Sequence, residues 1–143
     1  MTNEIYPCLW FPNKQAKAAA EFYCTVFPNA KIVSENAIVV NWQIGTRIFM
    51  GLNDAPATMP FNESSSFVIT CKDQAEIDHY WNKLTADGGK EKMCGWCTDK
   101  FGISWQVVPA ILGELMSDPK RAPKVVQAFL KMKKFDIAKL LEA

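Results

Sequence analysis

The residue spacing with the clearest chemical meaning in this 143-residue chain is Cys94-Gly-Trp-Cys97. Two cysteines separated by two residues can form a redox-active dithiol that opens a helix, or supply half of a zinc site. The zinc alternative needs a second pair of ligands, but Cys8, Cys24 and Cys71 are scattered single residues. We therefore interpret Cys94 and Cys97 as two separate thiols on a strand or turn.

Cys8 is the one candidate for a catalytic nucleophile. A cysteine nucleophile needs a nearby base that lowers its thiol pKa. The single histidine, His79, is expected beside Tyr80 on a helix, away from Cys8. Cys8 is more simply interpreted as a small buried side chain, so the catalytic residues are unassigned and Cys8 is only a candidate.

An amide interrupts the apolar segment ISWQVVP, in which Gln106 is the fourth residue. Strand alternation would place Gln106 on one face with Ser104 and Val108. A buried amide without a hydrogen-bond partner is costly, so something must satisfy it. Gln106 is therefore either a core amide bonded to neighbouring backbone or a cleft amide that orients a carbonyl or hydroxyl group of a ligand.

The elements that must position these residues follow an order that occurs twice. The first half is expected to form a strand, a helix and three strands, at 4–11, 14–27, 30–35, 37–44 and 46–52. After a loop at 54–64, the second half is expected to form a strand, a helix and further strands, at 65–71, about 74–86, 90–97 and 103–108. Asp73 is the expected N-cap of the second helix.

An offset of 57 residues relates the two halves. The landmarks that it superposes are Cys8 and Ser65, Tyr23 and Tyr80, and Gly45 and Gly102. The expected fold class is therefore α+β, with two βαβββ modules, at 4–53 and 65–109, that form a curved mixed sheet around a cleft. We expect a single domain over residues 1–143.

Residues 110–143 lack strand alternation, and their apolar spacing predicts two short amphipathic helices. Such helices must pack on their own domain or on a second subunit. This apolar surface favours a homodimer.

Charge and hydropathy exclude several classes of partner. Sixteen basic and 15 acidic residues give a net charge of +1, so no nucleic acid is expected as a partner. We interpret Lys131, Lys133 and Lys134 as a solvated helix face. There is no apolar run of about 20 residues and no signal-peptide pattern. We expect a cytoplasmic protein with reduced thiols and no membrane partner.

Four stretches carry a family resemblance: PCLWF, EFYCTVFPNAKI, EIDHYWNKLTADGG and CGWCTDKFGISWQVVP. Together with the paired modules over residues 4–109, they resemble the vicinal oxygen chelate superfamily of glyoxalase I, bleomycin-resistance proteins and extradiol dioxygenases. Within it, they look like the PhnB-like branch, often labelled 3-demethylubiquinone-9 3-methyltransferase-like. The resemblance implies sheets packed into a cleft and frequent dimerisation.

The resemblance also implies four positions that commonly hold a divalent metal through His and Glu. These positions fall on Cys8, Phe49, Ser65 and Gln106. A phenyl ring cannot bind a metal, and a thiol, a hydroxyl and a neutral amide form a poor set of ligands. We therefore expect no metal and no other cofactor.

The expected function is binding of a small, apolar or planar molecule in a metal-free cleft. The expected ligand-binding residues are Cys8, Trp10, Trp42, Phe49, Ser65, Phe67 and Gln106, although the aromatic ones also suit a core. One alternative is an enzyme of lyase or isomerase type, with or without a metal, that uses Cys8 or a carboxylate such as Glu63. Another is an interaction module whose tail binds a protein.

Methyl transfer is not expected, whatever the label of the resembling branch. The glycines do not form a GxGxxG cluster, and the strand order lacks the βα alternation of a cofactor-binding parallel sheet.

Overall fold

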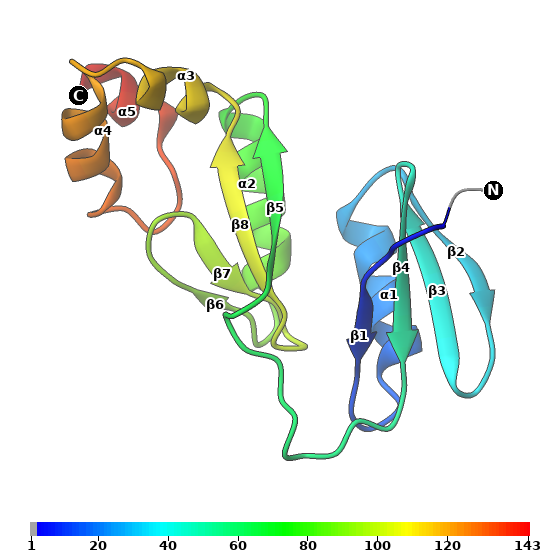
Figure 1. Cartoon of the computed structure of the whole chain (residues 1–143). Coiled ribbons are helices and arrows are strands. Elements are labelled where there is room, and N and C mark those ends of the chain that lie inside the picture. Colours follow the sequence, from blue (N-terminus) through cyan, green and yellow to red (C-terminus); the bar gives the residue numbers. More distant parts are fainter. Residues whose placement is uncertain (1–2) are drawn as a thin grey trace. The chain divides into compact units, whose positions relative to one another are not determined.

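The computed structural model describes residues 3–143 and divides into two compact units, with the boundary between Pro60 and Phe61 (Figure 1). The elements of the first unit are β1 (Cys8–Trp10), α1 (Ala16–Val26), β2 (Ala30–Glu35), β3 (Val39–Ile44) and β4 (Arg47–Leu52). Its sheet has the order β1-β4-β3-β2, in which β1 and β4 are parallel and the other neighbours are antiparallel.

Helix α1 packs on the first sheet through an apolar stripe. Its buried residues recur at helical spacing: Ala16, Ala19, Ala20, Tyr23 and Val26. The small alanines let the helix approach the sheet closely, and a Cβ added at Gly51 of β4 would lie 3.0 Å from the Ala16 side chain. The core of this unit therefore lies between α1 and one face of the sheet.

The second unit repeats this order and extends it with three helices. Its elements are β5 (Ser66–Cys71), α2 (Gln74–Thr85), β6 (Lys90–Glu91), β7 (Trp96–Thr98), β8 (Ser104–Pro109), α3 (Ile111–Ser117), α4 (Ala122–Phe129) and α5 (Ile137–Glu142). The sheet order β5-β8-β7-β6 matches that of the first unit, and β5 is again parallel to β8. The α+β class with two βαβββ modules is confirmed.

Helix α2 covers the second sheet as α1 covers the first. Ile77, Trp81 and Leu84 are its buried residues. The predicted N-cap is confirmed, because Asp73 Oδ1 accepts a hydrogen bond from the Glu76 N–H at 2.9 Å. Trp81 Nε1 donates to Glu91 Oε1 at 2.7 Å and thereby ties α2 to β6.

The single strand predicted near 90–97 is wrong, because this stretch folds back on itself. Lys90 pairs with Thr98 and Glu91 with Cys97, so β6 and β7 are neighbours in a hairpin. Residues 92–95 form its turn, in which Cys94 and Gly95 have positive φ values of 59° and 78°. The hairpin therefore supplies two of the three strands that follow α2 in the second module.

The tail also differs from its prediction. It forms three helices instead of two, because residues 111–117 are helical. It belongs to the second unit, where Leu115, Val125, Phe135 and Leu140 are buried, whereas Met116, Leu130 and Leu141 are exposed. Lys131, Lys133 and Lys134 lie between α4 and α5 and not on a helix face, which corrects that interpretation. Among residues 3–143, no helix is both long and apolar enough to cross a membrane.

Candidate functional site

Each sheet has one face beneath its helix and one open face, and the register assigns residues to these faces. In the second unit, Phe67 pairs with Trp105, and their rings lie 5.4 Å apart. Trp105 is buried and β8 contacts α2, so this is the helix-covered face. The alternate pair, Val68 and Gln106, lies on the open face, where Val68 is 57% exposed.

Gln106 is the polar centre of this open face. Its Nε2 donates a hydrogen bond to Ser66 Oγ at 3.0 Å, and it pairs across the sheet with Trp96 of β7. Among the described residues, no donor reaches the Gln106 carbonyl oxygen. Ser104, on the same face, is 1% exposed, and its hydroxyl has no hydrogen-bond partner in residues 3–143. The open face therefore offers a fixed amide with an available acceptor beside apolar surface.

The open face of the first unit carries Cys8 and Trp10. Cys8 pairs with Met50 and Trp10 with Leu52. Gly51 lies between Met50 and Leu52 and faces the Trp42 ring beneath α1. Because side chains alternate along a strand, Met50 and Leu52 point to the opposite, open face. Cys8 is exposed, and Trp10 is 38% exposed, with its Nε1 donating to the Asn53 carbonyl at 2.9 Å.

Three of the predicted ligand-binding aromatics lie instead on the helix-covered faces. Trp42 and Phe49 stack at 5.7 Å with an interplanar angle of 6°, and Trp42 also lies 5.6 Å from Tyr23 of α1. Phe67 packs on Trp105. These contacts correct the expectation that Phe49 and Phe67 share the open faces with Trp10. Ser65 is exposed and lies one residue before β5, so Ser66 is the serine that Gln106 contacts.

The difference comes from the lengths of two hairpin loops. Two residues separate the paired Ile44 and Arg47, whereas five separate the paired Thr98 and Ser104. The residue four positions after Gly45 is Phe49, on the helix-covered face, whereas the residue four positions after Gly102 is Gln106, on the open face. The same count reaches opposite faces because a one-residue change in strand register moves every side chain to the other face of the sheet. Met50, not Phe49, is the open-face residue of β4 at the level of Cys8.

Sequence reasoning therefore missed Met50, Ser66 and Val68 as open-face residues. The signal that could have found them is the spacing of turn residues, since Asp99 to Ile103 form a longer loop than Gly45-Thr46. The role of the predicted set in ligand binding remains a prediction.

Cys8 has the exposure but not the electrostatics of a nucleophile. Partial burial raises the pKa of its thiol, so the unreactive protonated form dominates at neutral pH. His79 is exposed on α2 of the other unit, where its ring contacts Tyr80 edge-on at 4.9 Å. Glu63, the candidate carboxylate, forms an ion pair with Lys92.

The duplicated βαβββ order, with one helix on each mixed sheet, defines a protein of the vicinal oxygen chelate fold. The chain belongs to the 3-demethylubiquinone-9 3-methyltransferase family, whose profile matches residues 3–108. A comparison with curated proteins found no match.

Solved structures agree with this assignment. The PhnB protein of Bacillus cereus is 27% identical with a TM-score of 0.68, and the match covers 76% of this chain and 100% of that chain. Protein PA1353 of Pseudomonas aeruginosa is 21% identical with a TM-score of 0.63, over 76% and 98% of the two chains. FosX of Listeria monocytogenes, solved with Mn(II) and sulfate, is 11% identical with a TM-score of 0.58, over 82% and 97%. The last two show the fold alone.

The residues at the predicted metal positions do not fit a divalent ion. Phe49 is buried in the core, and Gln106 is a neutral amide bonded to Ser66. Within residues 3–143, no group of three or more His, Cys, Asp or Glu side chains could hold a metal.

Proposed function

We propose that the protein binds a small planar or apolar molecule on the open faces of its sheets without a divalent metal. The main support for this proposal is the geometry of Gln106. The hydrogen bond to Ser66 orients its amide and leaves its carbonyl oxygen available to a donor on the ligand. Val68, Trp96 and Val108 surround it with partly exposed apolar surface. Such a combination of apolar lining and few polar groups suits a small-molecule site.

Binding of N-phenyl-1-naphthylamine, a neutral planar probe with one N–H donor, tests this proposal by fluorescence titration. We expect saturable binding and a three- to tenfold weaker affinity for Gln106→Leu, since one hydrogen bond contributes about 0.5–1.5 kcal/mol. Val68→Asp should weaken binding further by placing a charge on the open face. Gln127→Ala, an exposed change on α4, is the matched control. Equal affinities for all four proteins would refute the site.

The proposal that no metal takes part has its own test. Protein purified without added metal should contain far less than one equivalent of zinc, nickel, iron or manganese by mass spectrometry. Binding of the naphthylamine probe should be the same with and without a chelator. A stoichiometric metal, or loss of probe binding after chelation, would overturn the metal-free mechanism while leaving the fold unaffected.

Methyl transfer is not part of the proposal, although the family's name contains it. Both sheets are mixed and each carries its module's helix on one face, unlike the parallel doubly wound sheet that holds adenosine-type donors. Cys8→Ala should weaken probe binding, because Cys8 lies on an open face; a loss of measured turnover with binding intact would instead favour the enzyme alternative.

We also propose that the protein forms a homodimer in solution. Ile5 and Tyr6 before β1 are 97% and 43% exposed, and such apolar residues often mark a contact between subunits. Light scattering at micromolar concentration should give about twice the mass of one chain. A mass of 16.1 kDa would refute the dimer.

A further inference from the structure

A cavity of about 480 Å³ opens between helix α2 and the segment that joins α4 to α5. Its walls are residues 131–136 and Lys139 on one side and Gln74 and Asp78 on the other. We call it the lysine groove, because four lysines line it: Lys131, Lys133, Lys134 and Lys139. The family match ends at residue 108, so the lysine side of the groove lies outside the shared fold.

The segment that carries the lysines is fixed in place along its backbone. The N–H groups of Cys94 and Gly95 donate to the carbonyls of Met132 and Lys133 at 2.7 and 2.8 Å. Phe135 is 2% exposed and packs so close to Gly95 that a Cβ added there would overlap its ring. The backbone that carries the lysines is therefore fixed before any ligand arrives, which lowers the part of the entropy cost of binding that comes from ordering the segment.

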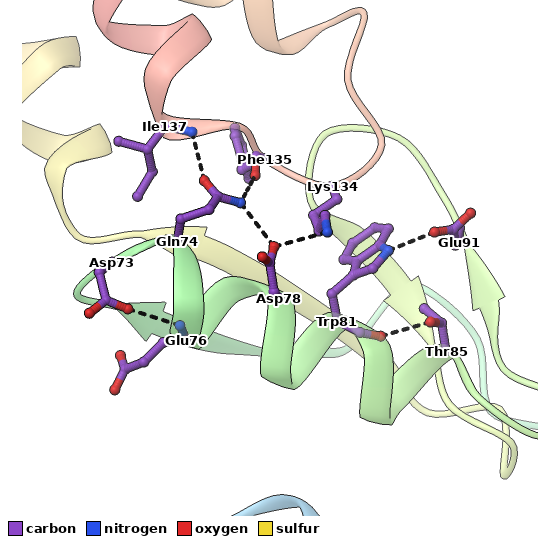
Figure 2. Close-up of polar contacts among 10 residues, drawn as sticks. All are labelled: Asp73, Gln74, Glu76, Asp78, Trp81, Thr85, Glu91, Lys134, Phe135 and Ile137. Carbon is purple, nitrogen blue, oxygen red and sulfur yellow. Dashed lines mark hydrogen bonds and ion pairs between the residues drawn. The ribbon is translucent and has the colours of Figure 1, made fainter.

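Gln74 completes this attachment, as Figure 2 shows. Its Oε1 accepts a hydrogen bond from the Ile137 N–H at 2.9 Å, and its Nε2 donates to the Phe135 carbonyl at 2.9 Å and to Asp78 Oδ1 at 3.1 Å. All the polar atoms of the Gln74 amide are thus engaged in holding the walls of the groove together.

The two carboxylates in the groove are already occupied. Asp78 forms an ion pair with Lys134 at 2.9 Å, and this contact, with the one from Gln74, lowers the pKa of the carboxyl group. Asp136 caps α5 by accepting a hydrogen bond from the Lys139 N–H at 3.2 Å. Among the described residues, Lys131, Lys133 and Lys139 have no ion-pair partner. Three lysines without an ion-pair partner therefore line one groove, and the Asp136 carboxylate is the one lining acid among the described residues that no ion pair neutralises.

We propose that the lysine groove binds a small polyanion that carries phosphate groups. Ammonium groups are common ligands of phosphate because each brings a compact charge and three donors. The volume is in the range of small-molecule sites. This site is separate from the open sheet faces, so a test of it does not depend on the proposed function.

Calorimetric titration of the full chain with pyrophosphate at low salt tests the proposal. We expect saturable binding that weakens as sodium chloride is raised from 20 to 200 mM, because partly exposed charges are screened. The triple variant Lys131→Gln, Lys133→Gln, Lys139→Gln should bind at least tenfold more weakly, which corresponds to about 1.4 kcal/mol.

A second triple variant is the matched control. Lys31, Lys83 and Lys124 are exposed and lie outside the groove, so changing all three to Gln alters net charge equally. It should bind pyrophosphate within twofold of the wild type. Equal losses in both triple variants would show only a general charge effect and overturn the site. Absence of binding at 10 mM pyrophosphate would also overturn it, as would binding of an oligoglutamate peptide but not of pyrophosphate.

Discussion

The two units share a strand order but hold their elements together by different means. In the first, the helix N-cap Gln15 makes no side-chain cap, and Asn53 at the end of β4 supplies the missing acceptor to the Ala16 N–H at 3.0 Å. In the second, Asp73 caps its own helix, and Asp99 supports the β7–β8 loop. A repeated topology therefore does not require repeated contacts, and only the second unit depends on a tail.

The largest expected effect is on the β7–β8 loop. Asp99 is 2% exposed, and its carboxylate accepts hydrogen bonds from the N–H groups of Phe101 and Ile103 and from Trp105 Nε1. Asp99→Ala should lower the free energy of unfolding by about 3–4 kcal/mol, since buried donors lose a charged acceptor. Urea denaturation measures it, with the exposed Glu21→Ala as control. A decrease of less than about 1 kcal/mol in the free energy of unfolding would mean that the β7–β8 hairpin, like the β3–β4 hairpin, is stabilised by its backbone hydrogen bonds alone.

The second test concerns the first unit alone. Asn53 is 8% exposed, and its Nδ2 donates to the Ala37 carbonyl while its Oδ1 serves α1. Asn53→Ala should destabilise the protein by about 2 kcal/mol and should increase amide exchange in α1 but not in α2. Hydrogen exchange with mass spectrometry distinguishes the helices, and the exposed Asn82→Ala is the control. Equal increases in both helices would contradict independent support of the two units.

The third test releases the tail from α2. Gln74→Ala should cost about 1–3 kcal/mol, because the Ile137 N–H and the Phe135 carbonyl lose their side-chain partner. It should also speed limited proteolysis between α4 and α5. Gln127→Ala, exposed on α4, should do neither. Unchanged proteolysis would mean that the backbone bonds to Cys94 and Gly95 suffice.

The smallest effect is a pH dependence specific to the second unit. The folded-state pKa of Asp78 lies below its ordinary value of 3.8, chiefly through the hydrogen bond from Lys134. A lowered pKa adds stability that is present above the unfolded-state pKa and is lost as pH falls through the folded-state pKa. The stability difference between the wild type and Asp78→Asn should therefore shrink from pH 6 to pH 2. The exposed Gln127→Ala, which changes no charge, is the control; a difference that grew in acid would contradict the ion pair.

Differences in burial give Cys8, Cys71 and Cys97 different expected reactivities. Desolvation raises the pKa of both Cys71 and Cys97 to about 12, and both side chains are fully buried. Cys8 is exposed. A thiol reagent should modify Cys8 in the folded protein and reach Cys71 and Cys97 only after denaturation, which peptide mass spectrometry can establish.

The sequence allowed prediction of the element order, because apolar periodicity and turn residues are local signals. The helix at 74–86, its Asp73 cap and the strand that contains Gln106 all follow from such signals. The open face could not be fully predicted, because the faces of Phe49 and Gln106 depend on hairpin register, which a count from glycine does not fix. The hydrogen bond between Gln106 and Ser66 was also missed, because the predicted strand begins at residue 65 whereas β5 begins at Ser66.

The contact between Gly95 and Phe135 has a consequence for how this sequence can change over evolutionary time. The Bacillus cereus relative is matched over its full length by 76% of this chain, and the family profile ends at residue 108, before the tail. A descendant that lost the tail would remove the clash with the Phe135 ring, but a Cβ at position 95 would still lie 2.8 Å from the Val107 carbonyl oxygen. Position 95 is thus restricted to glycine by the sheet as well as by the tail. Glycine at this turn should therefore persist among related genes whether or not they keep the aromatic residue of the tail.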